Sequence, residues 1–121
     1  MTQGHEIEKQ YAGTHVLVEF WESIIIEDPV KIEEILLESC KKAHCKPIKA
    51  LIHKFEPQGV SGIVLLEESH ISLHSWPERD YLGIDLFTCG DSSLIDKAIE
   101  YLENQFQPKR VEITKIDRGK F

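Results

Sequence analysis

The sequence has few basic residues, no long apolar run and only three cysteines. Its 14 lysines and arginines are outnumbered by 21 aspartates and glutamates, which gives a formal net charge of -7. Proteins bind phosphate backbones largely through Lys and Arg, so this balance argues against nucleic acid as a partner and favours a cationic small molecule. No apolar run approaches the roughly 18 residues of a membrane span, so no association with a membrane is expected.

The three cysteines, Cys40, Cys45 and Cys89, match no zinc or redox spacing. The N-terminal segment MTQGHEIEKQ lacks the basic and apolar parts of a signal peptide, which predicts a cytoplasmic protein without a disulfide framework. Cys40 falls on the apolar stripe of an expected helix and is interpreted as a core residue. His44 and Cys45 follow that helix, where a metal pair is the alternative to an ordinary helix end. The helix end is the favoured interpretation, so no metal is predicted.

What the sequence does contain is a succession of strand and helix patterns over 121 residues, the size of one domain. Two amphipathic helices are expected, because Asp28-Pro29 and Asp91-Ser92-Ser93 each supply a capping side chain before apolar residues at helical spacing. Alternating apolar and polar residues predict six strands: Thr14–Trp21, Ile48–Phe55, Val60–Glu67, His70–Trp76, Tyr81–Thr88 and Arg110–Ile116.

This order predicts an α+β fold, a two-layer sandwich in which both helices cover one face of a largely antiparallel sheet of about six strands. The other face of the sheet would then be uncovered. In a chain of this size it would expose a broad apolar surface to water, and a second copy of the chain is the obvious cover. We therefore expect a homodimer.

Three motifs in order carry a family resemblance: GVSG at residues 59–62, EESHISLHSWPE at residues 67–78 and DLFTCGD at residues 85–91. Together they resemble the prokaryotic S-adenosylmethionine decarboxylase proenzymes, and the resemblance extends from about Gly13 to Gly119. Several ordered motifs at compatible spacing are much more specific than any one of them. The resemblance implies an enzyme that processes itself.

The resemblance implies that the chain cuts its own backbone between Glu68 and Ser69. A serine is needed there because its hydroxyl can attack the preceding carbonyl and convert the amide into an ester. Elimination from the ester, followed by hydrolysis, leaves a pyruvoyl group at residue 69, so that Ser69 is the precursor of the cofactor. The products within this one domain would be a β chain of residues 1–68 and an α chain of residues 69–121.

The resemblance also assigns catalytic roles. The pyruvoyl ketone would form a Schiff base with the substrate amine and accept the electrons released when carbon dioxide leaves. His74, assisted by Ser61, would remove the proton during elimination, and Cys89 would return a proton to the substrate carbon. The implied activity is decarboxylation of S-adenosylmethionine for spermidine synthesis, in a homodimer of αβ units whose active sites lie at the interface.

Three further residues are assigned to substrate binding. Glu78 would hold the ribose hydroxyls, and Phe55 would stack on the substrate, with Trp76 as a second candidate. Aromatic faces suit both an adenine ring and a sulfonium cation. An acidic pocket could equally hold a guanidinium or an amine, so arginine and ornithine stay open as substrates.

The sequence leaves two questions open, one about activity and one about the geometry of Ser69 and His74. Taken singly, each of these residues has an ordinary structural interpretation, and a non-catalytic dimerising paralogue is the alternative to an enzyme. Ser69 and His74 are also five residues apart, so that on one regular strand they would face opposite sides of the sheet. Either the backbone is kinked near Ser69, or His74 reaches the cleavage site in another way.

Overall fold

The structure is a computed structural model that describes residues 11–67, 69–88 and 92–121. Its elements follow the predicted order, with one short 3-10 helix, η1, added. The elements are β1 (Gly13–Trp21), α1 (Pro29–Lys42), β2 (Pro47–Lys54), β3 (Val60–Leu66), β4 (His70–Trp76), η1 (Pro77–Arg79), β5 (Tyr81–Thr88), α2 (Ser92–Phe106) and β6 (Arg110–Arg118).

The first helix begins where the sequence predicts. The backbone N–H of Val30 donates to the Asp28 carboxylate at 3.1 Å, and proline occupies the first turn. The capping bond satisfies a backbone donor that has no partner inside the helix. The side chains of Ile32, Leu36 and Cys40 are fully buried, so the predicted apolar stripe and the core position of Cys40 are confirmed. Asp91, the residue predicted to open the second helix, lies outside the described residues.

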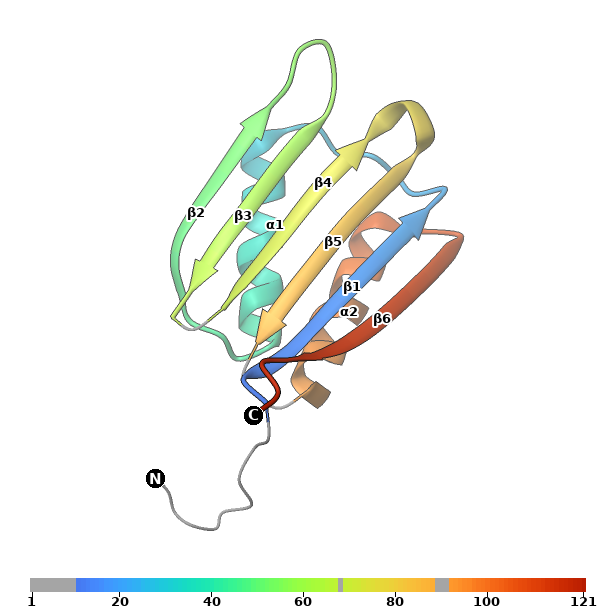
Figure 1. The fold of residues 1–121 in the computed structure, drawn as a ribbon. Coiled ribbons are helices and arrows are strands. Elements are labelled where there is room, and N and C mark those ends of the chain that lie inside the picture. Colours follow the sequence, from blue (N-terminus) through green and yellow to red (C-terminus); the bar gives the residue numbers. More distant parts are fainter. Residues whose placement is uncertain (1–10, 68, 89–91) are drawn as a thin grey trace.

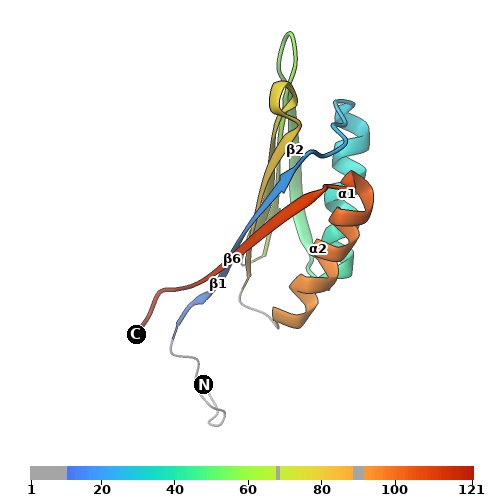
Figure 2. The ribbon, with the colours of Figure 1, turned by 90° about the vertical axis from the view of Figure 1, so that its right-hand side faces the viewer.

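The six strands form one sheet in the order β2-β3-β4-β5-β1-β6, and every neighbouring pair is antiparallel. Figure 1 shows both helices running across the sheet, α1 behind the β2–β4 half and α2 behind the half that contains β1 and β6. In the side view of Figure 2 the two helices lie on the same side. The predicted two-layer α+β sandwich is thus confirmed.

Side-chain alternation gives the sheet two different surfaces. On β3, Val60, Val64 and Leu66 are buried beneath the helices, whereas the residues between them point the other way. We call this second surface, opposite the helices, the bare face. Five of its apolar side chains are 38% to 66% exposed: Leu17, Leu51, Ile63, Leu65 and Trp76.

Small differences from the sequence prediction concern the ends of elements. The last strand continues to Arg118 rather than Ile116, because β6 pairs with the whole length of β1 as far as Gly13. The turn after Trp76 is a 3-10 helix, which the sequence pattern does not predict. Among the described helices, none combines the length and the apolar character that a membrane crossing needs.

The packing of α1 on the sheet makes a direct stability prediction. Replacing Leu36, which is fully buried, by Ala should lower the free energy of unfolding by about 2 to 5 kcal/mol, because a cavity would remain in the core. Val30 lies on the same helix and is 65% exposed, so Val30→Ala should change it by less than about 0.5 kcal/mol. Urea denaturation of both variants measures the difference, and equal effects would contradict this packing.

Candidate functional site

Ser69 lies in the tight turn that joins β3 to β4. The Leu66 N–H donates to the Ser69 carbonyl at 2.9 Å, and the Ser69 N–H returns a longer bond of 3.5 Å to the Leu66 carbonyl. The serine is partly exposed and stands immediately before the first residue of β4. Because it belongs to a turn and not to the strand, the alternation rule does not place its side chain relative to His74.

His74 and Ser61 form a pair on the bare face. They are directly opposite each other in the β3–β4 register, and Ser61 Oγ lies 2.8 Å from His74 Nδ1. The structure therefore brings together the two residues that were assigned to processing. They line a cavity of about 300 Å³ on the bare face. Its other lining residues are Leu51, His53, Gly62, Ile63, His70 and Ser72.

A second cavity of about 300 Å³ lies on the other side of His74, toward β1. Gly83 is opposite His74 in the β4–β5 register, and a side chain there would come within 3.3 Å of the Tyr81 hydroxyl. The glycine thus leaves open the space beside Trp76 and Tyr81, whose ring centroids are 5.3 Å apart. Trp76 is one of the residues predicted from the sequence, whereas the second cavity is not predicted from it.

Tyr81 and Glu19 give the second cavity a polar wall. The Tyr81 hydroxyl donates to Glu19 Oε1 at 2.9 Å. Partial burial, together with the hydrogen bond to Glu19 and its negative charge, raises the pKa of Tyr81 to about 12. The phenol therefore stays protonated at neutral pH, and the Glu19 carboxylate offers negative charge to a cation in the cavity.

The other two predicted binding residues lie at the end of the sheet opposite to Ser69. Phe55 follows β2, is 46% exposed and packs edge-on against the His53 ring at 4.5 Å between centroids. Glu78 lies in η1, and Gln58 Nε2 donates to its Oε1 at 3.4 Å. Both side chains are exposed, so they are accessible to a ligand or to another chain.

The two residues assigned to processing lie away from Ser69, His74 farther along β4 and Ser61 opposite it on β3. Five residues of extended strand span roughly 16 Å at about 3.3 Å per residue. Since β4 runs without interruption from His70 to Trp76, His74 is too far along the strand to touch Ser69 in the same chain. The backbone does turn near Ser69, as the first of the two options held, but this turn does not bring His74 of the same chain to Ser69.

A polar cluster on the bare face was missed by the sequence analysis. Asp85 on β5 contacts His15 on β1 and both His70 and Ser72 on β4. His15 and Asp85 are 70 positions apart, and only the pairing of β1 with β5 brings them together. The sole signal in the sequence was that alternation within each strand would put all four residues on one face.

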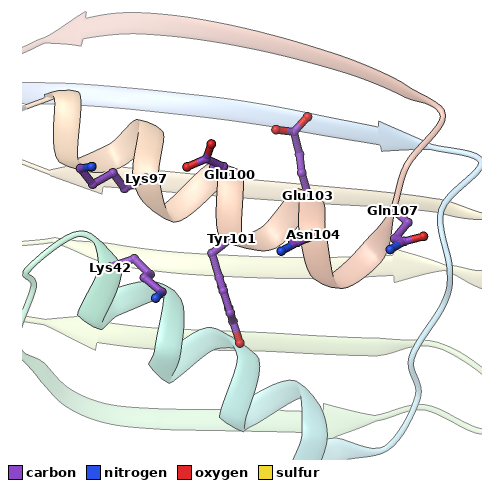
Figure 3. A pocket seen from close by; sticks show the side chains of 7 residues that line it. All are labelled: Lys42, Lys97, Glu100, Tyr101, Glu103, Asn104 and Gln107. Atoms are coloured by element: carbon purple, nitrogen blue, oxygen red, sulfur yellow. The ribbon is translucent and has the colours of Figure 1, made fainter.

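A larger hollow of about 780 Å³ lies on the helix side of the molecule. In Figure 3 the labelled side chains of α2 line the groove, with Tyr101 pointing toward α1 and Lys42 on α1 facing it. Its lining mixes lysines with glutamates and includes none of the residues predicted for the site. The whole sheet separates this groove from the Ser61–His74 pair.

Neither described cysteine is poised as a reactive thiol. Burial, reinforced by neighbouring Cys45, raises the pKa of Cys40 to about 12. Burial also raises the pKa of Cys45, although a hydrogen bond with Thr88 opposes the shift. A thiol with a raised pKa is a poor nucleophile at neutral pH. Cys89, the predicted proton donor, and Glu68, the residue before the predicted cut, lie outside the described residues.

Known proteins resemble this chain over most of its length. A family model for S-adenosylmethionine decarboxylase matches residues 14–119. An S-adenosylmethionine decarboxylase proenzyme from Pyrococcus furiosus is 39% identical over 109 residues, covering 88% of this chain and 78% of the relative. A proenzyme of the same name from Clostridium tetani is 38% identical over 111 residues, covering 90% and 88%.

The fold has a solved counterpart as well. The crystal structure of the adenosylmethionine decarboxylase from Aquifex aeolicus aligns with a TM-score of 0.85 and 33% sequence identity, covering 93% of this chain and 95% of that one. The family match over residues 14–119 and the similar fold of the solved structure point to the same family. The chain belongs to the S-adenosylmethionine decarboxylase family.

Proposed function

We propose that this protein is a self-processing S-adenosylmethionine decarboxylase that cuts itself between Glu68 and Ser69 and uses a pyruvoyl group formed from Ser69. The observation that carries the proposal is the serine of the ESH motif in the β3–β4 turn of a chain of this family. Relatives such as the Pyrococcus furiosus protein bear the name proenzyme, which supports a processing step.

The turn suits an attack by the Ser69 hydroxyl on the preceding carbonyl. Its own carbonyl is fixed by the Leu66 N–H at 2.9 Å, and the next residue is already held in β4 between two strands. The backbone after the reacting bond is therefore anchored, and the partly exposed serine stands where the sheet ends. Attack forms the ester, and its elimination releases the carboxylate of residue 68, with the nitrogen leaving as ammonia on hydrolysis.

The residues at the end of the sheet near Ser69 fit a pyruvoyl group at position 69. β5 ends at Thr88, one residue before Cys89, and His70 and Phe87 are register partners. The strand leading to Cys89 thus ends at the same end of the sheet at which β4 begins. When present, the pyruvoyl group supplies an electron sink for the loss of carbon dioxide from a bound α-amino acid. Cys89 would deliver the proton that replaces the carboxylate on the substrate.

The proton removed during elimination needs a base, and His74 fits that role through a second copy of the chain. Its hydrogen bond to Ser61 at 2.8 Å orients the imidazole. Within one chain the roughly 16 Å of strand between His74 and Ser69 prevents contact. A second copy packed against the bare face could place its own Ser61–His74 pair beside Ser69. The active site would then be shared between two copies.

The bare face has the chemistry of such an interface. Its large apolar side chains are up to 66% exposed in the single chain, and they surround a central group of partly buried polar residues. An apolar surface of this kind on a protein of 121 residues usually marks a contact with another chain. A homodimer that buries the face would explain both the exposed apolar surface and the separation of His74 from Ser69.

Substrate binding is assigned to the cavity beside Trp76 and Tyr81. Flat aromatic rings and the Glu19 carboxylate suit a sulfonium cation attached to an adenine-bearing group. Glu78 and Phe55 would complete the site by contacting the ribose and the base. The family match favours S-adenosylmethionine over arginine and ornithine, which share only the α-amino acid part of the chemistry.

Self-cleavage is tested by the intact mass of the purified protein. The wild-type chain should give two fragments divided between residues 68 and 69, the second without a free amino terminus. Ser69→Ala should give one uncut chain with the same circular dichroism, because the hydroxyl that attacks is missing. A wild-type chain still whole after long incubation would support the non-catalytic paralogue instead.

The role of Cys89 is tested by separating processing from turnover. Cys89→Ala should be cut normally, but its kcat for release of labelled carbon dioxide from S-adenosylmethionine should fall by at least about 100-fold, because a general acid is lost. The normal yield of fragments serves as the internal control for folding. Parallel assays of the wild-type protein with labelled arginine and ornithine should show no turnover. Turnover of arginine or ornithine without turnover of S-adenosylmethionine would overturn the choice of substrate.

Sharing of the site between copies is tested by complementation. His74→Ala should cut itself at least about 100-fold more slowly than the wild-type chain, because it lacks the base. In a mixed dimer of one His74→Ala chain and one Ser69→Ala chain, the intact His74 of the Ser69→Ala chain would face the intact Ser69 of the His74→Ala chain. The His74→Ala chains should then be cut, as intact mass after purification on two different tags would show. Uncut chains in isolated mixed dimers would mean that His74 acts within its own chain.

A further inference from the structure

The cluster around Asp85 is a feature of the bare face to which the proposed reaction assigns no role, although Asp85 also lines the cavity beside Trp76 and Tyr81. His15 Nε2 lies 2.6 Å from Asp85 Oδ2, and His70 Nε2 lies 3.1 Å from the same oxygen. Ser72 donates its hydroxyl hydrogen to the other carboxylate oxygen. The four side chains come from three adjacent strands, β1, β5 and β4. The Asp85 carboxylate on β5 thus links the first residue of β4 to β1, the strand on the other side of β5.

The cluster resembles a metal site, since His15, His70 and Asp85 place one ligand atom each within 4.8 Å of one another. The surroundings of His15 favour a different interpretation. An Arg118 guanidinium nitrogen lies 3.2 Å from His15 Nδ1, and a guanidinium can only donate. Nδ1 must therefore accept, so Nε2 carries the hydrogen and donates it to Asp85. That nitrogen then has no lone pair for a metal ion.

The carboxylate is stabilised in its charged form. Partial burial by itself would raise the pKa of Asp85, but the hydrogen bonds from Ser72, His15 and His70 outweigh it and hold the pKa below its usual value. Asp85 is therefore ionised throughout the neutral range, with donors on both oxygens. Hydrogen bonds to an ionised acceptor are stronger than neutral ones.

The position of His70 connects this cluster to the cleavage site. His70 directly follows Ser69 and is the first residue of β4. Its ring also packs against the His15 ring at 5.7 Å and the Phe87 ring at 6.1 Å between centroids. Before any cut, the β3–β4 turn holds this end of the strand covalently. After a cut, residue 69 becomes a chain end, and chain ends fray unless something holds them.

We propose that Asp85 and its three donors, His15, His70 and Ser72, form a clamp that keeps the start of β4 in place once the turn has been cut. The proposal rests on the proposed cleavage before Ser69. Asp85 also lines the second cavity, but donors of the same chain occupy both of its carboxylate oxygens. We therefore treat it as a positioning residue that would hold residue 69 through His70. The clamp contributes little in the uncut chain, because the covalent β3–β4 turn already holds the start of β4 in place.

The dependence on cleavage makes the clamp testable. Asp85→Asn keeps the shape of the side chain and removes the charge. It is made in the self-cleaving protein and in the uncut Ser69→Ala protein, and hydrogen exchange is followed in a peptide covering residues 70–76. In the cut protein the substitution should speed exchange by about tenfold or more, whereas in the uncut protein the change should stay within about twofold.

Glu19→Gln is the matched control, because it alters another carboxylate that accepts a cross-strand hydrogen bond on the same face. It should leave exchange in residues 70–76 unchanged in both backgrounds. The cut Asp85→Asn protein should also have a lower kcat than the cut wild-type protein. Its content of pyruvoyl carbonyl, measured by hydrazine labelling, should stay normal. If Asp85→Asn is not cut, His15→Ala replaces it, since it removes one donor to Asp85 from β1, farther from the cleavage site.

The possible results separate the two proposals. An equal increase in exchange in cut and uncut proteins would make the cluster an ordinary structural contact and overturn the clamp, as would no increase in either. A wild-type protein that is not cut between residues 68 and 69 would instead refute the proposed function. Intact mass, recorded before any exchange measurement, distinguishes that case.

Discussion

Alternation of side chains along antiparallel strands, combined with helices on only one face, is the constraint on which the rest of this structure depends. One set of alternate residues builds the core beneath α1 and α2, and the other set forms the bare face. The Ser61–His74 pair, the cavity beside Trp76 and the Asp85 cluster all belong to the second set. A shift of one residue in the register of β4 would exchange its polar and apolar sides and lose the core and the site together.

The bare face serves two requirements that conflict in most proteins. Large apolar side chains at its surface favour contact with another chain, whereas ionised groups are costly to cover. The structure reduces that cost by giving Asp85 three donors and Glu19 the Tyr81 hydroxyl within the same chain. These carboxylates have hydrogen-bond partners before any second chain arrives, so covering the face would leave neither one unpaired.

Local patterns predicted the elements well, because each depends on a few neighbouring residues. Asp28-Pro29 did begin α1, and the bounds of β4 and β5 were predicted to the residue. Contacts between distant segments could not be predicted: the hydrogen bond from His15 to Asp85 depends on the pairing of β1 with β5, which no local pattern encodes. The Ser61–His74 pair was expected from the family resemblance alone, and its geometry follows from the register of β3 on β4. Glu68 and Cys89 lie outside the described residues, so their assignments stay predictions.

The strand order β2-β3-β4-β5-β1-β6 has a consequence for the protein that the proposed cut would produce. Residues 1–68 contain β1, β2 and β3, whereas residues 69–121 contain β4, β5 and β6. Across the sheet the two fragments therefore alternate, and β1 of the first is held between β5 and β6 of the second. The fragments could separate only by breaking three strand interfaces, β3–β4, β5–β1 and β1–β6, as well as the contacts between α1 and α2. Such an interlocked pair would stay assembled without a disulfide or any other covalent link, and would be very slow to exchange its parts.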